Sequence, residues 1–132
     1  MGRSIKLNGY FGGDAGFPAP VELIASVSGA GMGETLTLEC KGACRVSMPY
    51  RPIERLAREA YAECSRQEKN SMEFAVRLDA QDMNRHKAEA TAYLRVNGNF
   101  LMLSVDFLDT GQISAPFAPI AQMVRDERKT FA

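Results

Sequence analysis

The sequence contains no tryptophan, a single histidine and no long run of apolar residues. A membrane-spanning helix needs about 18 or more consecutive apolar residues, so we expect no transmembrane helix. The first residues, Met1–Lys6, also lack the apolar stretch of a secretory signal peptide. We therefore expect a cytoplasmic protein.

The chain has no excess of charge of either sign, because 16 Lys and Arg residues balance 16 Asp and Glu residues. Proteins that hold duplex DNA mainly through its phosphates normally carry a basic excess. The equal numbers of acidic and basic residues argue against binding of duplex DNA mainly through its phosphates. A local basic patch is still compatible with a net charge of zero.

The common motifs of catalysis are absent too, including the P-loop, the nucleophile elbow and the zinc-protease motif. A Ser or Cys nucleophile needs a nearby base, and the one histidine, His86, lies in a charged loop. The pairs Asp79 with Asp82 and Asp106 with Asp109 are typical of solvated strand ends. We therefore expect no enzyme, and a small hydrolase with a cleft near Asp79, Asp82 and His86 is the enzymatic alternative.

Cysteine is scarce, with only Cys40, Cys44 and Cys64. An odd number in a chain without a signal peptide favours reduced thiols, which behave mostly as small buried apolar groups. A zinc site would need a fourth ligand, and only one histidine is present. We expect no metal and no cofactor.

The length of 132 residues fits one domain with a substantial core. Apolar and polar residues alternate with period two in several segments, which is typical of half-buried strands. Residues 44–48 could continue the strand before them after a kink at Gly42. The predicted strands cover residues 4–11, 21–28, 35–40 and 72–78, and a hairpin covers residues 89–108.

A helical period of apolar residues occurs once before this hairpin and predicts a helix over residues 52–67. Pro52 suits its first turn. Residues 113–132 are predicted to be a C-terminal extension, extended at first and then a short helix or disordered. The apolar stripe of the predicted helix consists of Ile53, Leu56, Ala57, Ala60, Tyr61 and Cys64.

This order of elements predicts a mainly β protein with an OB-like antiparallel barrel of five or six strands over residues 1–112. The helix would lie between the third and fourth barrel strands. An open α+β sheet packed under the helix is the competing architecture.

The dipeptide Asn97-Gly98 between two alternating runs is a strong hairpin signal. A two-residue loop there sets Leu94 opposite Leu101 and Tyr93 opposite Met102. One face of the hairpin is then apolar and core-like. The other face carries Thr91, Tyr93, Arg95, Phe100, Met102 and Ser104.

The second face combines two aromatic side chains with a cation, as single-strand nucleic-acid binders do. The arrangement resembles the small bacterial OB-fold proteins that bind single-stranded DNA, including those of conjugative and integrative elements. The resemblance implies a non-enzymatic protein that binds single-stranded DNA or RNA. A homo-oligomer is also compatible with the exposed face. The residues the resemblance implicates are Tyr93, Arg95 and Phe100 for stacking, and Arg85 and Lys87 for phosphate contacts. By position on strands and loops we add Arg77 and Phe17.

Two other interpretations of this face stay open. Tyr93, Phe100 and Met102 could form a protein interface, since an exposed apolar patch commonly marks one. The helix or the C-terminal segment could instead cover them, in which case the face is structural.

Overall fold

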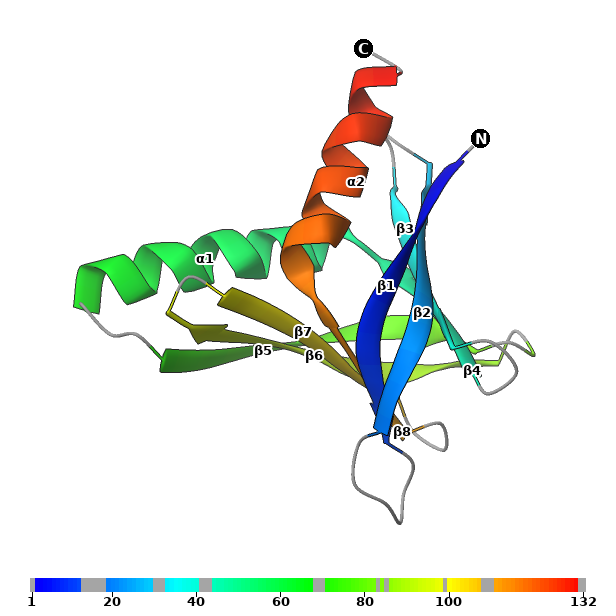
Figure 1. Ribbon diagram of the computed structural model, residues 1–132, viewed down its shortest axis with the longest axis horizontal. Helices are drawn as coiled ribbons and strands as arrows, with labels where there is room; N and C mark the ends of the chain where they lie inside the picture. Colours follow the sequence, from blue (N-terminus) through cyan, green and yellow to red (C-terminus); the bar gives the residue numbers. More distant parts are fainter. Residues whose placement is uncertain are drawn as a thin grey trace.

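The computed structural model describes residues 2–12, 19–29, 33–40, 44–67, 71–82, 84, 86–98, 100–107 and 111–130. It contains eight strands and two helices in this described part (Figure 1). Neither helix is long and apolar enough to cross a membrane. The elements are β1 (Gly2–Gly12), β2 (Ala19–Ser28), β3 (Thr35–Cys40), β4 (Cys44–Pro49), α1 (Arg51–Gln67), β5 (Ser71–Gln81), β6 (Lys87–Asn97), β7 (Phe100–Phe107), β8 (Gly111–Pro116) and α2 (Phe117–Thr130).

The strands form a closed barrel in which each strand pairs with its neighbours in sequence. Every pairing is antiparallel, and β8 closes the barrel by pairing with β1 through Tyr10, Phe11 and Gly12. A Cβ atom on Gly9 would lie 2.3 Å from the carbonyl oxygen of Ser114. Only glycine therefore allows β1 to approach β8 this closely.

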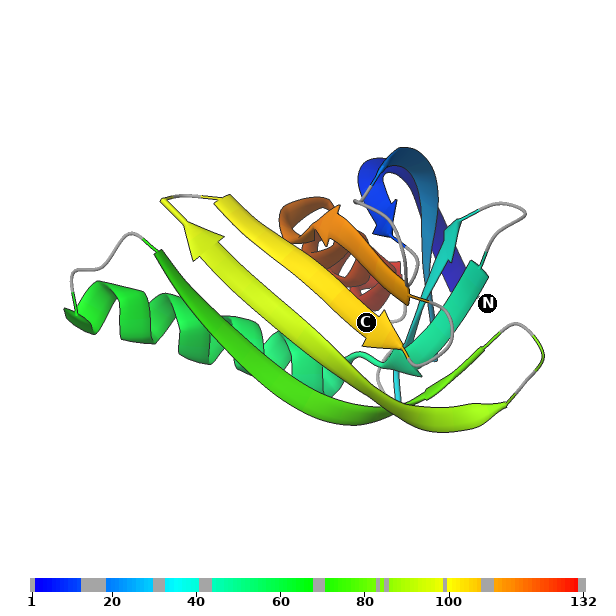
Figure 2. The same ribbon diagram turned by 90° about the horizontal axis from the view of Figure 1, so that it is seen from below.

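The barrel is closed unevenly. β5 and β6 pair over their full lengths, from Ser71 with Asn97 to Gln81 with Lys87. By contrast, the described part of the chain joins β4 to β5 through one pair, Ser47 with Gln81. The long β5–β6–β7 sheet extends beyond this seam, and α1 packs along its inner side (Figures 1 and 2).

The predicted β-rich barrel is confirmed, but the strand number and the helix position are wrong. The helix lies between β4 and β5 of an eight-stranded barrel. Residues 44–49 do not continue β3, because Cys44 pairs with Cys40 and the chain reverses between them. The segment Gly111–Pro116 is a barrel strand, with Ile113 and Ala115 buried. Its two core residues are too few for a clear alternating pattern.

The register of the β6–β7 hairpin also differs from the prediction. Asn97 pairs with Phe100 and Leu94 pairs with Leu103, so the loop is shifted by one residue. Gly98 has a φ of 64°, the left-handed region that glycine adopts at low cost. The shift moves each cross-strand partner by two residues, and since side chains alternate with period two, the predicted faces are unchanged.

Helix α1 begins and ends close to the predicted bounds, and five of its six predicted stripe residues are buried. Tyr61 is the exception, with 46% of its surface exposed. Helix α2 packs Ile120, Met123 and Val124 into the core. At its first residue, the ring of Phe117 stacks on Tyr50 with centroids 6.3 Å apart.

A buried carboxylate anchors the far end of α2. Glu34 precedes β3, and its side chain is fully inaccessible to solvent. Arg128 donates from Nε to Glu34 Oε2 at 2.7 Å and from Nη1 to Glu54 Oε2 at 2.8 Å. These hydrogen bonds, above all that to Glu34, raise the pKa of Arg128, so the guanidinium stays charged. A second pair joins Arg3 of β1 to the buried Glu127 at 3.2 Å.

Removing Arg128 is expected to leave the buried carboxylate of Glu34 without its hydrogen-bonded guanidinium, while Arg51 lies 3.9 Å away. Breaking a buried ion pair on one side typically costs about 3–5 kcal/mol, so we expect Arg128→Gln to lower the free energy of unfolding by about 3 kcal/mol. Urea denaturation measures the loss. The exposed neighbour Lys129 provides the control, since Lys129→Gln should cost less than about 0.5 kcal/mol. Equal stability of the two variants would contradict the anchoring role.

Candidate binding face of the barrel

The outward side chains of β6 and β7 form one open face. Tyr93 and Arg95 project from β6 and Phe100 and Met102 from β7, while the intervening residues are buried. Phe100 is 51% exposed. Figure 2 shows no helix in front of β5, β6 and β7 on this side, so the helices do not cover it. We call these four residues, together with Tyr10, the outer face.

Tyr10 reaches the outer face through closure of the barrel. It pairs with Ser114 of β8, which in turn pairs with Ser104 of β7. The hydroxyls of Ser104 and Ser114 are hydrogen-bonded at 2.8 Å. Tyr10 is 44% exposed, although sequence reasoning did not include it. Its outward position in the first strand was readable, but its proximity to Tyr93 depends on the pairing of β1 with β8.

A groove of about 490 Å³ runs across these strands. Tyr10 and Tyr93 line it, and the two hydrogen-bonded serines lie between them in the strand order. The remaining lining residues are Glu73, Arg95, Met102, Asp106 and Gln112. The groove is therefore partly aromatic and partly polar, with small hydroxyl side chains in the middle.

The charges of this face largely neutralise one another. Arg95 donates to Glu73 Oε2 from Nη2 at 2.6 Å and from Nε at 3.0 Å. Arg77 lies 3.8 Å from Glu89 across β5 and β6. At the described outward positions of β5–β8, three cations (Arg77, Lys87 and Arg95) face four carboxylates (Glu73, Asp79, Glu89 and Asp106). The face is aromatic without being basic.

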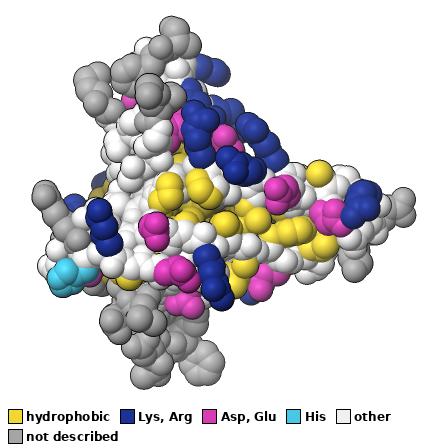
Figure 3. Space-filling model, turned by 180° about the vertical axis from the view of Figure 1, so that it is seen from behind, with side chains coloured by type: hydrophobic (Ala, Val, Ile, Leu, Met, Phe, Trp, Pro, Cys, Tyr) yellow, Lys and Arg dark blue, Asp and Glu magenta, His cyan; other side chains and the backbone are white. Residues whose placement is uncertain are grey.

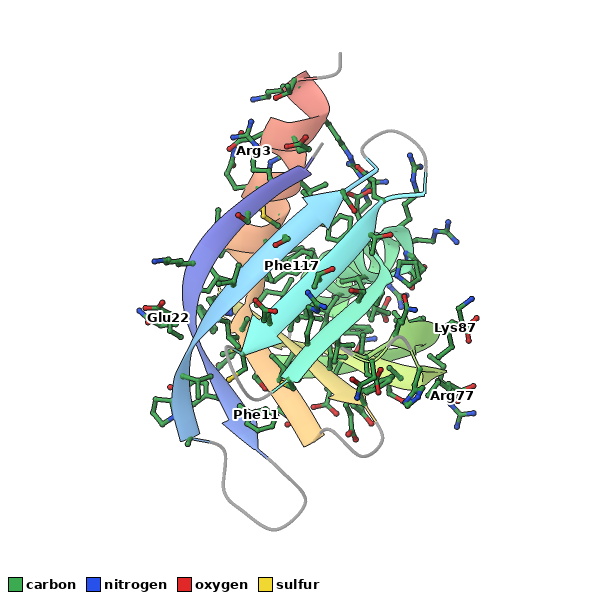
Figure 4. The ribbon with its side chains drawn as sticks, turned by 90° about the vertical axis from the view of Figure 1, so that its right-hand side faces the viewer. Arg3, Phe11, Glu22, Arg77, Lys87 and Phe117 are labelled. Atoms are coloured by element: carbon green, nitrogen blue, oxygen red, sulfur yellow. The ribbon has the colours of Figure 1, made fainter. Side chains whose placement is uncertain are left out.

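The other predicted site residues divide into two groups. Arg77 and Lys87 lie near one another at the β5–β6 end of the barrel and point away from it (Figure 4). The structure thus places them on the same sheet as Tyr93. Arg85 and Phe17 lie outside the described residues.

Asp82, which lies close to His86, has a structural role. Asp82 Oδ1 accepts the backbone N–H groups of Asn84 at 2.9 Å and His86 at 2.8 Å, which stabilises the turn between β5 and β6. The exposed His86 ring lies 3.5 Å from Asp82 Oδ2. A nearby cleft of about 520 Å³ at the β4–β5 seam is lined by Asp79 and Lys87, and its lining includes neither Asp82 nor His86. Asp109 lies outside the described residues.

The three cysteines are free and buried. Burial raises the pKa of the Cys40 thiol and raises that of Cys44 to about 11. Within the described ranges, no three His, Cys, Asp or Glu side chains are grouped so as to hold a metal ion.

No protein-family model, curated protein or solved structure matches this chain.

The thiols are expected to be unreactive in the folded protein. The Cys44 thiol, with a pKa of about 11, is ionised in roughly one molecule per thousand at pH 8, and the thiolate is the reactive form. Burial shields Cys40 and Cys64 from the reagent. We expect Ellman's reagent at pH 8 to modify the native protein at least about 100-fold more slowly than the urea-unfolded protein. Ser65→Cys on exposed α1 is the positive control and should react at once. Rapid modification of the native wild-type thiols would contradict their burial.

Proposed function

We propose that the protein is a non-enzymatic interaction module, and that its outer face binds a second copy of the chain. The observation that carries this proposal is the exposed aromatic face, on which a projecting Phe100 lies beside a groove of about 490 Å³. Aromatic residues and methionine are enriched in protein interfaces, and Tyr93 and Met102 line the groove. A projection and a groove on one face make it self-complementary, as a two-fold contact requires.

The charges of the outer face also favour a second copy of the chain as the partner. In a two-fold contact each copy presents the same patch, so the adjacent Arg95 and Glu73 can each pair with the opposite charge of the other copy. In such a contact the Arg95 and Glu73 charges of the two copies balance one another. A strongly charged partner would gain little from this face, because its own cations and carboxylates are already nearly equal in number.

Single-stranded nucleic acid is the second candidate. Tyr10, Tyr93 and Phe100 supply aromatic rings on one face, and base stacking contributes about 1–3 kcal/mol per base. Lys87 and Arg77 are exposed at the end of the same sheet. The four carboxylates among the described outward positions oppose the phosphate backbone, and for this reason we place the nucleic-acid function second.

Self-association through the outer face predicts that Phe100→Glu lowers the mass measured by sedimentation equilibrium from that of a dimer to that of a monomer. Removing a central aromatic anchor commonly costs 2 kcal/mol or more, which corresponds to roughly a 30-fold weaker dimer. Tyr61→Glu is the matched control, because Tyr61 is similarly exposed but lies on α1, away from this face. Its mass should equal that of the wild type.

Two results would overturn the proposal. One is a wild-type protein that stays monomeric at every concentration tested. The other is binding of fluorescent oligo-dT at low salt that Tyr93→Ala with Phe100→Ala abolishes, which would assign the face to single-stranded nucleic acid instead.

A further inference from the structure

A third concave site lies on another side of the molecule, between α1 and α2. It is a cleft of about 390 Å³, a volume within the range of small-molecule pockets. Its apolar lining comes from both helices and the segment before α1: the stacked rings of Tyr50 and Phe117, and the small side chains of Ala57 and Ala121. The small alanines leave space where the two helices meet.

Cations surround this apolar lining. Arg58, Arg125 and Arg128 line the cleft together with only one carboxylate residue, Glu54. Figure 3 shows Lys and Arg side chains gathered beside a band of apolar side chains on the back of the molecule. The balance of charge here is opposite to that of the outer face.

Two of these arginines, Arg58 and Arg125, have little negative charge close to them, in contrast to Arg128. Arg128 is hydrogen-bonded to the buried Glu34, and its Nη1 also donates to Glu54 Oε2 at 2.8 Å. Arg58 lies 3.5 Å from Glu54 Oε1, and its side chain is 77% exposed. Arg125 donates to the neutral Gln122 Oε1 at 2.8 Å. An incoming anion can therefore pair with Arg58 and Arg125 without breaking a buried ion pair.

We propose that this cleft binds a small aromatic anion, a flat ring system bearing one carboxylate, sulfonate or phosphate group. The apolar lining accepts the rings, and the half-exposed Tyr61 at the edge adds an aromatic surface. The guanidinium groups of Arg58 and Arg125 bind the anionic group, for which arginine is well suited. The site is independent of the outer face and of its proposed partner.

Two dyes of matched shape test the proposal on the full chain: 1-anilinonaphthalene-8-sulfonate, which is anionic, and N-phenyl-1-naphthylamine, which has the same rings without the charge. We expect the fluorescence titration to show one binding site for the sulfonate dye, and weaker binding of the amine dye. Arg58→Gln combined with Arg125→Gln should weaken the sulfonate at least tenfold and the amine less than twofold. Both arginines are exposed, so circular dichroism should show unchanged folding.

Further variants separate this site from other surfaces. Ala121→Phe fills the cleft and should abolish binding of both dyes, whereas Arg55→Gln on the exposed surface of α1 should leave both unchanged. Phe100→Glu should also leave both unchanged, so a failure of this proposal is distinct from a failure of the outer-face proposal. Absence of sulfonate binding, equal binding by the double arginine variant, or loss of binding in Phe100→Glu would each overturn the aromatic-anion site.

Discussion

The buried carboxylate of Glu34 and the guanidinium of Arg128 anchor the end of α2 to the rest of the fold. Glu34 lies before β3, and Arg128 lies 94 residues later, near the end of α2. Because the same guanidinium also binds Glu54 of α1, three distant parts of the chain meet at a single side chain. This contact places α2 beside α1, and the cleft between the helices exists because of that placement.

Local patterns were sufficient for most of the secondary structure. Period-two alternation located β1, β2, β3 and the β5–β7 strands, and the helical period located α1. What the patterns lacked was information on pairing. The hairpin of β3 and β4 and the short strand β8 become evident only from partners that lie elsewhere in the chain. The burial of Glu34 had no sequence signal, since a carboxylate is ordinarily expected at the surface.

The outer face was likewise predicted from local patterns only in part, because the rest depends on strand pairing. Tyr93, Arg95 and Phe100 share a side of the sheet because strand parity is a local property, and parity survives a register shift of two residues. The addition of Tyr10 and the pairing of Arg95 with Glu73 follow from the neighbours of β1 and β5. The sequence therefore located the aromatic residues but not the carboxylates that neutralise the cation among them.

The single pair Ser47 with Gln81 between β4 and β5 has a consequence for motion. Cooperative units of a protein open with free energies that reflect how many contacts each must lose. Among the described residues, seven interfaces of the barrel are joined by three or more residue pairs and the eighth by one, so we expect the lowest opening free energy at that eighth interface. Amide protons next to this interface should therefore exchange with solvent well before those at the centre of the β6–β7 ladder. Local opening of the barrel begins where β4 separates from β5.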